Sequence, residues 1–391
     1  MSKIDDLIAK MCPDGVVHKT LKDVATVNTG TQLNRSTLAV TGLYPVMNGG
    51  INPSGYHNEF NTKANTTVIS QGGASAGYVT WMNKKLWAGA HCFVVFPNEN
   101  LVTGRFLFHF LKGSQQAIQN MKTGAGIPGL NRSKLVELTI PLPPLEIQKE
   151  IVAILDKFTE LEAELEAELE ARKKQFAYLL DFSFDNDHIR KSGAKPLSSF
   201  GEFDRGNGLQ KTDFSESGTG CIHYGQIYTK FGSYTDTVFT YVSNNLASKL
   251  KRVKPGNLVV TTTSENIEDV CKSVAWLGNQ DIVIGGHSCI YRHSMDPLFA
   301  TYLFRSRLFQ DQKNSFVQGT KVKDIKPIQI GRILVYVPDL DSQVAIGKML
   351  QDFDKLIMDI NSGLPAEINA RRLQYEYYRN KLLTFKELDV A

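Results

Sequence analysis

The sequence lacks the features that mark membrane and secreted proteins. None of its apolar runs approaches the ~20 residues needed to span a bilayer. Residues 1–11 carry four charged side chains among the apolar ones, a pattern that excludes a secretory signal peptide. The five cysteines are scattered, form no C-x-x-C pair and are odd in number, so we expect reduced thiols and no structural zinc site. We therefore expect a cytoplasmic protein.

Signatures of catalysis are also missing. The chain has no G-x-x-x-x-G-K-[ST] phosphate loop and no H-E-x-x-H zinc motif. Residues 52–55 resemble an adenine-methyltransferase motif, but they lack its second proline and its aromatic residue. His91 and Cys92 are neighbours on an expected strand, where adjacent side chains point to opposite faces, so a structural role is favoured for them over nucleophilic catalysis. The same reading applies to His287 and Cys289. We expect no catalytic site and no bound metal in this chain.

Charge is modest overall but unevenly distributed. The net charge is +4, and residues 145–175 contain nine acidic and five basic side chains. That segment is therefore negative, and the rest of the chain carries the compensating positive charge. A basic body with one acidic segment is compatible with nucleic acid as a partner, although many cytoplasmic enzymes share this balance.

The chain contains an internal repeat. Near the start of each copy, matches recur at an offset of 176: Lys19 with Lys195, Leu21 with Leu197, Gly30 with Gly206, and Leu33 with Leu209. Later matches have a larger offset: residues 89–91 with 285–287, 143–148 with 338–343, and 171–176 with 370–375. Each copy is thus a globular unit followed by a helical segment. The globular parts have diverged by insertion, while the helices stay alike. Two similar helical parts suggest that the same partner is bound twice, and two dissimilar globular parts suggest that each recognises a different target.

Both helical segments have coiled-coil spacing. Apolar residues from Ile147 to Leu169 recur at intervals of three and four, and residues 160–171 are three copies of Glu-Leu-Glu-Ala, which are strong helix formers. The second helix is expected from Leu340 to about Phe385, with an interruption over residues 361–365. Each could be an amphipathic helix packed on its own domain. Their length and their repetition favour two antiparallel helices that act as a spacer.

The globular units are expected to be rich in short strands. Candidate strands cover residues 67–70, 78–81, 92–96, 257–262, 273–276 and 289–291, and candidate helices cover 106–121 and 297–316. Glycine-rich polar loops lie between them, at residues 48–55, 70–77 and 123–132. Their Asn, Gln, Ser, Arg and Lys side chains are of the kinds that contact base edges and phosphates. Each loop could also be a simple hairpin turn.

Together these segments resemble the specificity subunits of type I restriction-modification enzymes. Residues 140–158, the Glu-Leu-Glu-Ala repeats and residues 171–176 resemble the central conserved helix of that family, and residues 363–385 resemble its C-terminal one. Residues 44–55 resemble a stretch of its target-recognition domains. The resemblance covers essentially the whole chain.

The resemblance implies an α+β fold. Two mixed, strand-rich target-recognition domains, in a pseudo-two-fold arrangement, would be separated by two long antiparallel helices that form a coiled-coil spacer. The expected segments are a first target-recognition domain at 1–143, a central conserved spacer helix at 144–182, a second target-recognition domain at 183–337, and a C-terminal conserved spacer helix at 338–391.

The same resemblance implies a function in DNA modification. Each recognition domain would read one half of a bipartite site in double-stranded DNA. Two methyltransferase subunits would dock on the helices, and restriction and translocation subunits would join them. Methylation and cleavage would then belong to these partners, together with S-adenosylmethionine, magnesium and ATP, and this chain would be a non-catalytic subunit without a cofactor.

Candidate contact residues follow from the loops and the helical seam. The residues expected to contact bases or phosphates are Arg35, Asn48, Gln71, Lys122, Asn131 and Arg132 in the first unit and Lys211, Gln226, Thr263, Asn266, Lys321 and Lys323 in the second. The residues expected to pack the spacer helices are Ile151, Ile154, Phe158, Leu161, Leu165, Ile346, Leu350 and Phe353. Basic contacts should strengthen binding to every sequence, whereas Asn and Gln should set base preference.

Two other classes of function stay open. One is a decoy or interaction protein on the same frame that reads no DNA, although a DNA mimic should be strongly acidic. The other is the recognition component of a stand-alone DNA methyltransferase, for which a methyltransferase motif would be needed. A salt-dependent mobility shift with random duplex would separate a reader from a decoy.

Overall fold

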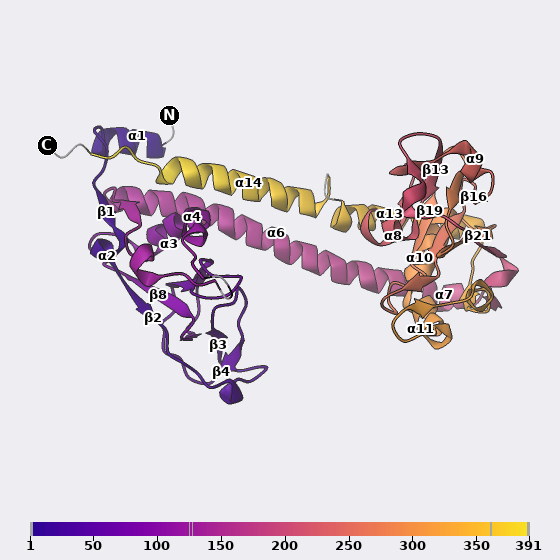
Figure 1. Ribbon diagram of the computed structural model, residues 1–391, viewed down its shortest axis with the longest axis horizontal. Helices are drawn as coiled ribbons and strands as arrows, with labels where there is room; N and C mark the ends of the chain where they lie inside the picture. Colours follow the sequence, from indigo (N-terminus) through magenta and orange to yellow (C-terminus); the bar gives the residue numbers. More distant parts are fainter. Residues whose placement is uncertain (1–2, 125, 127, 360–361, 389–391) are drawn as a thin grey trace. The chain divides into compact units, whose positions relative to one another are not determined.

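The computed structural model describes residues 3–124, 126, 128–359 and 362–388 (Figure 1). It divides into two compact units. Unit 1 comprises Met1–Glu166 together with Glu367–Ala391, and unit 2 comprises Ala167–Ala366. The long helix α6, Leu145–Asp185, contributes its first half to unit 1 and its second half to unit 2. Both units mix strands with helices, which confirms the predicted α+β class.

Unit 1 is built around a four-stranded antiparallel sheet in the order β2-β8-β5-β6. A smaller sheet has the order β4-β3-β7, and β1 pairs with β9. The strands are β1 (His18–Thr20), β2 (Ala25–Thr29), β3 (Tyr44–Met47), β4 (Gly55–His57), β5 (Thr66–Ser70), β6 (Val79–Met82), β7 (Trp87–Ala88), β8 (Cys92–Pro97) and β9 (Thr139–Pro141). The short helices are α1 (Lys3–Met11), α2 (Leu21–Val24), η1 (Arg35–Thr37), α3 (Gly104–Gly113), α4 (Gln115–Asn120) and α5 (Arg132–Leu135). Every residue of β5 is buried, as expected for a central strand.

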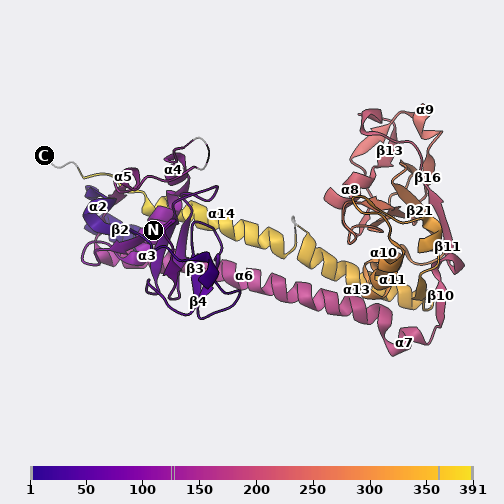
Figure 2. The same cartoon turned by 60° about the horizontal axis from the view of Figure 1, so that its bottom comes forward.

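Unit 2 has two five-stranded sheets, β11-β21-β17-β19-β14 and β12-β15-β13-β20-β16. Figure 2 shows β11 beside β21, with which it pairs. The strands are β10 (Ala194–Pro196), β11 (Gly201–Arg205), β12 (Phe214–Ser215), β13 (Thr219–Ile222), β14 (Tyr234–Thr235), β15 (Thr240–Val242), β16 (Lys251–Val253), β17 (Leu258–Thr261), β18 (Thr263–Ser264), β19 (Ser273–Trp276), β20 (Ile282–Ile284), β21 (Ser288–His293), β22 (Lys323–Asp324) and β23 (Leu334–Tyr336). The helices are α7 (Asp187–Arg190), η2 (Leu197–Ser199), η3 (Lys211–Asp213), α8 (Tyr224–Thr229), α9 (Asn244–Ala247), α10 (Pro297–Arg305), α11 (Arg307–Phe316), α12 (Pro327–Ile330), α13 (Leu340–Met358) and α14 (Leu364–Leu383), the last of which lies mainly in unit 1.

The expected strands are confirmed as β5, β6, β8, β17, β19 and β21, with small shifts at their ends. The helical segments expected over 106–121 and 297–316 are confirmed, and each is a pair of shorter helices. The helical conformation is interrupted at Ser114 in unit 1 and at Ser306 in unit 2. Ser306 has extended backbone angles, and its hydroxyl accepts the Phe309 N–H, so it caps a new helix. Serine competes for backbone hydrogen bonds in this way, and apolar periodicity does not reveal it.

The second long helix is likewise two helices, α13 and α14, as the interruption predicted. Asn361, within that interruption, lies outside the described residues. In unit 1, α14 runs antiparallel to the first half of α6. The rings of Phe158 and Tyr378 stack with centroids 5.3 Å apart, and Arg372 pairs with Glu162 and Glu166.

A chain of polar contacts, buried at His109 and Tyr375, joins three helices of unit 1. Nε2 of His109 on α3 donates to Asp156 on α6 at 2.7 Å, and the Tyr375 hydroxyl on α14 donates to Nδ1 of His109 at 3.0 Å. Arg105 also donates to Asp156, at 2.7 Å. Burial lowers the pKa of His109, so the neutral ring of this chain is favoured.

The last described residues close unit 1. The Val16 N–H donates to the Lys386 carbonyl, and the Leu388 N–H donates to the Val16 carbonyl, both at 2.9 Å. Gly15 beside them has φ +114°, and a Cβ there would lie 2.5 Å from the Lys386 carbonyl oxygen. Only glycine fits this approach.

Candidate nucleic-acid interface

The two units build the same frame of backbone hydrogen bonds at the ends of their main sheets. In unit 1, the Gln71 N–H donates to the His91 carbonyl at 2.8 Å, and the Leu130 N–H donates to the Gln71 carbonyl at 2.7 Å. In unit 2, Thr262 makes the same two bonds at 3.0 Å, with His287 and Ile325 in the matching places. Three loops far apart in the sequence are thereby fixed beside one another in each unit.

Steric crowding explains why the two copies of the repeat share a glycine at positions 30 and 206. The Gly30 N–H donates to the Cys92 carbonyl, and the Gly206 N–H donates to the Ser288 carbonyl, both at 2.9 Å. A Cβ at Gly30 would lie 2.3 Å from the Gly89 carbonyl oxygen, and one at Gly206 would lie 2.2 Å from that of Gly285. The backbone approach at both places therefore excludes any side chain.

A second shared feature is a short loop closed on itself. Thr123 and Gly129 exchange two backbone hydrogen bonds of 2.9 Å in unit 1, and Gln318 and Asp324 do the same in unit 2. In unit 2 this loop carries Lys321, which is exposed, and Lys323, whose Nζ donates to the Gly319 carbonyl at 2.9 Å. In unit 1 the half-buried Lys122 comes directly before it.

The structure joins some of the candidate residues of unit 1 and leaves others apart. Asn48 and Gln71 both contact His91. The Asn48 Oδ1 accepts the His91 N–H at 3.2 Å, and the Gln71 backbone N–H donates to the His91 carbonyl. Asn131 caps α5 by accepting the Ser133 N–H at 2.9 Å, and Nε of Arg132 donates to the Val27 carbonyl at 2.6 Å. The side chains of Asn48, Asn131 and Arg132 thus already have hydrogen-bond partners within unit 1. Arg35 is exposed on η1 and has no side-chain partner within the described ranges.

The candidates of unit 2 gather more closely, around α8. Thr263 Oγ1 lies 3.1 Å from Nδ1 of His287, and Lys323 faces Ser264 across the β18–β22 pair. Gln226 is held by its own helix, because its Oε1 accepts the His223 N–H at 3.0 Å. Asn266 forms a closed turn in which its amide donates to the Asp269 carboxylate and its oxygen accepts the Asp269 N–H, both at 2.8 Å.

Thr263, Asn266 and His287 line a hollow of about 380 Å³, the α8 pocket, which the sequence did not predict. The residues that define it are Tyr224, Tyr228, Thr263, Glu265, His287 and Val322. The rings of Tyr224 and His287 lie 4.7 Å apart, and the Tyr228 hydroxyl donates to the Thr263 carbonyl. Aromatic rings next to hydrogen-bonding groups suit contact with nucleobases. The Tyr224–Tyr228 spacing of four residues after a capping His223 is a sequence signal that could have revealed it.

Burial shifts the pKa of the histidine that caps α8 and of cysteines in both units. Burial lowers the pKa of His223, and the charge of Lys211 acts in the same direction. Burial also raises the pKa of Cys92 to about 11 and that of Cys271 to about 12. All five cysteines are free and buried. Thiols of this kind stay protonated at neutral pH and are poor nucleophiles.

The helices carry the candidate packing residues in two separate cores. Ile151 is fully buried in the core of unit 1, and Leu350 is fully buried in that of unit 2. Ile154, Phe158, Ile346 and Phe353 are partly buried against these cores, and Leu161 and Leu165 are half-exposed.

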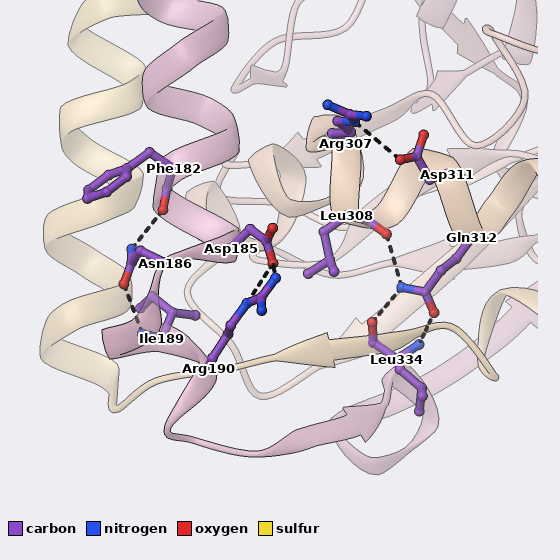
Figure 3. A network of polar contacts seen from close by, with 10 residues as sticks. All are labelled: Phe182, Asp185, Asn186, Ile189, Arg190, Arg307, Leu308, Asp311, Gln312 and Leu334. Atoms are coloured by element: carbon purple, nitrogen blue, oxygen red, sulfur yellow. Dashed lines mark hydrogen bonds and ion pairs between the residues drawn. The ribbon is translucent and has the colours of Figure 1, made fainter.

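A second hollow, of about 700 Å³, lies beside the end of α6 in unit 2. Among the residues that line it, Asp185 pairs with Arg190 and Arg307 pairs with Asp311 (Figure 3). Gln312 on α11 donates to the Leu308 and Leu334 carbonyls and accepts the Leu334 N–H. Tyr178 and Phe182 also line this hollow, with stacked rings whose centroids are 6.1 Å apart.

The described residues contain no group of three or more histidine, cysteine, aspartate or glutamate side chains arranged to hold a metal ion. No helix within the same ranges combines the length and the apolarity that crossing a membrane requires.

Comparison with known proteins identifies the family. The profile of the type I restriction modification DNA specificity domain matches residues 13–171 and again 194–370. A putative type I restriction enzyme specificity subunit of Haemophilus influenzae is 27% identical over 95% of this chain and 96% of its own length. The EcoR124I/EcoR124II specificity subunit of Escherichia coli is 30% identical over 64% of this chain and 63% of its own.

Solved structures show the same fold. The S subunit of a type I restriction-modification system from M. genitalium has a TM-score of 0.61 at 18% identity, covering 94% of this chain and 96% of that one. A chain from a study of complex assembly and conformational transition in a type I R-M system has a TM-score of 0.60 at 13% identity, covering 95% and 98%. With two matched domains that span most of its length, the chain belongs to the family of type I restriction-modification specificity subunits, whose role is DNA sequence specificity.

Proposed function

We propose that this chain reads a bipartite site in double-stranded DNA, with one half-site for each recognition domain. The observation that carries the proposal is the shared backbone frame with different side chains on it. Gln71 in unit 1 and Thr262 in unit 2 make the same backbone bonds, but the loops around them present different polar groups. A common frame with divergent loops suits two readers of different sequences on one kind of ligand.

The segments keep the roles assigned from the sequence. Residues 1–143 and 183–337 are proposed as the two readers, and 144–182 and 338–391 as the helices that set the gap between half-sites. Among the twelve candidate contacts, Lys211, Lys321 and Lys323 are proposed for phosphates. Asn48, Asn131 and Gln226 are proposed to act mainly by holding the loops, because their side chains are already hydrogen-bonded.

We further propose that methyltransferase subunits dock on the helices. The repeat places Phe176 and Tyr375 at equivalent positions, and both are buried. Two residues further on, Tyr178 is 67% exposed and Tyr377 is 63% exposed. Two equivalent exposed tyrosines suit one partner bound twice. Tyr178 lines the hollow beside the end of α6, which would receive one copy.

Catalysis is proposed to belong to those partners, and restriction and translocation subunits would complete the assembly. S-adenosylmethionine, magnesium and ATP would be bound there, and the complex would work in the cytoplasm. The absence of methyltransferase and phosphate-loop motifs from the sequence supports this division.

The test is to co-express the chain with a methyltransferase subunit of its system in a methylation-free host and to map modified adenines by single-molecule sequencing. A split motif with a fixed gap and one methylated adenine in each half is expected. A soluble complex without methylation and without a salt-dependent shift of duplex DNA would contradict the proposal and favour a decoy.

A further inference from the structure

One carboxylate in the α8 pocket has no structural task. The Asn266 amide donates a hydrogen bond to the Asp269 carboxylate, and the Tyr228 hydroxyl donates one to the Thr263 carbonyl. The Thr263 hydroxyl is hydrogen-bonded to the His287 ring. Glu265 is exposed, and its carboxylate has no hydrogen-bond or ion-pair partner in the described part of the chain. It stands at the opening of a pocket whose other polar groups largely bond one another.

The loop that carries Glu265 is held rigidly from behind. Lys313 of α11 is fully buried, and its Nζ donates to the Ile267 carbonyl at 2.7 Å. Thr261 Oγ1 donates to the Asp269 carbonyl at 3.0 Å, and the Asn266 turn closes the segment between them. A fixed loop loses little conformational entropy on binding, so a side chain on it can discriminate between ligands.

A carboxylate is costly on a surface that meets phosphates unless it faces a hydrogen-bond donor. The major groove offers two such donors, the amino groups of cytosine N4 and adenine N6. Adenine presents the N7 acceptor beside its amino group, which suits an amide with both a donor and an acceptor. A carboxylate has acceptors alone and therefore suits cytosine. The side-chain amide of Asn266, which lines the same pocket, is already bonded to Asp269.

We propose that Glu265 reads the N4 amino group of a cytosine in the half-site bound by unit 2. The exposed Lys321 and the half-buried Lys323 on the neighbouring loop supply phosphate contacts that offset its charge. Val322 between them is 59% exposed and lines the same pocket, where it gives the base pair an apolar contact. Lys313 is a positioning residue for this contact. The assignment rests on the proposed function.

The experiment maps methylated motifs for complexes that contain the wild-type chain, Glu265→Ala or Glu265→Gln. The wild-type motif is expected to require a C–G pair at one position of one half-site. Glu265→Ala should remove that requirement, with a roughly 5- to 100-fold loss of preference, and leave the other positions intact. Glu265→Gln should move the preference at that position towards adenine. Glu216 is exposed on another loop and has no side-chain partner among the described residues, so Glu216→Ala is the matched control and should keep the wild-type motif.

The outcomes distinguish a failure of the Glu265 assignment from a failure of the proposed function. An unchanged motif in both Glu265 variants, or a uniform loss of binding to all sequences, overturns the Glu265 assignment while the wild-type motif upholds the proposed function. A wild-type complex that prefers no sequence overturns both. Thermal unfolding of each variant shows whether the change lies in folding, and the near-isosteric Glu265→Gln keeps the test valid if the alanine variant fails to assemble.

Discussion

Gln148 and Gln343 hold the same position in the two units and make the same two hydrogen bonds. Each is buried, and each donates to the proline carbonyl five residues before it, at 2.9 and 2.8 Å. Each also accepts, at 2.9 Å, the backbone N–H of the residue that caps an earlier helix of its unit, Thr103 before α3 or Asp296 before α10. The glutamine in the repeated sequence therefore locks the start of a long helix to the domain in front of it.

Gln148→Leu should lower the free energy of unfolding of unit 1 by about 2–4 kcal/mol, because buried backbone groups at both ends of the amide lose their partners. Urea unfolding measures the loss. Gln116→Ala, at an exposed position on α4, should change the stability by no more than about 0.5 kcal/mol. Equal effects of the two substitutions would show that the Gln148 bonds contribute nothing.

The chain of bonds through His109 should couple α14 to α3. Tyr375→Phe removes the hydroxyl that donates to His109 Nδ1, and leaves a buried acceptor unpaired, so a loss of about 1–2 kcal/mol is expected. The same substitution in a His109→Phe background should cost less. A double-mutant cycle of urea unfolding measures the difference, and strictly additive losses would refute the coupling.

Lys313→Met should loosen the loop that carries Glu265 without unfolding unit 2. Burial lowers the pKa of Lys313, so loss of its charge removes a desolvation cost while the methionine fills the space of its stem. Hydrogen exchange should accelerate over residues 264–269, and discrimination between cognate and altered duplexes should fall. Ser315→Ala, exposed on the same helix, should leave both unchanged. Unchanged exchange in Lys313→Met would show that the lysine does not anchor the loop.

Unit 2 should lose stability in mild acid through His293. Burial lowers its pKa to about 4, so the unfolded chain takes up a proton near the ordinary value of 6.5 while the folded chain does not. Stability is then complete above about pH 6.5 and declines as the pH falls towards 4, by about 2 kcal/mol between pH 7 and 5. Urea unfolding, followed by hydrogen exchange of unit 2 peptides, should show a smaller decline in His293→Phe. The exposed His188→Gln should keep the wild-type slope.

Removal of one Glu-Leu-Glu-Ala copy, residues 164–167, should shorten the gap in the methylated motif. α6 is one continuous helix through these repeats, so four residues remove ~6 Å of rise, equivalent to one or two base pairs at ~3.4 Å each. Glu164→Ala keeps the length and should keep the gap. Motif mapping decides, and an unchanged gap in the deletion variant would refute a spacer role for α6.

The sequence predicted most of what depends on local pattern. Apolar spacing located α6 and α13, and the repeat paired Gly30 with Gly206 before their backbone contacts were known. It did not locate the serine breaks, because a cap depends on a backbone conformation that apolar periodicity does not encode.

The α8 pocket could not be predicted from the sequence either. Its walls come from Tyr224, Thr263, His287 and Val322, four segments joined by tertiary packing alone. Asn266 was predicted as a base reader from its residue type, whereas its hydrogen bonds depend on Asp269 adopting the facing position. Spacing rules describe neighbours in the chain, and this site is made of neighbours in space.

The closure of unit 1 by Lys386 and Leu388 has a consequence for synthesis on the ribosome. Unit 1 needs α14 and the segment after it, which are translated only after the whole of Ala167–Ala366. At ~5–20 residues per second, the N-terminal part of unit 1 waits on the order of tens of seconds for its last helix, which is the time in which unit 2 is synthesised. All of unit 2 therefore leaves the ribosome before the last helix of unit 1 does.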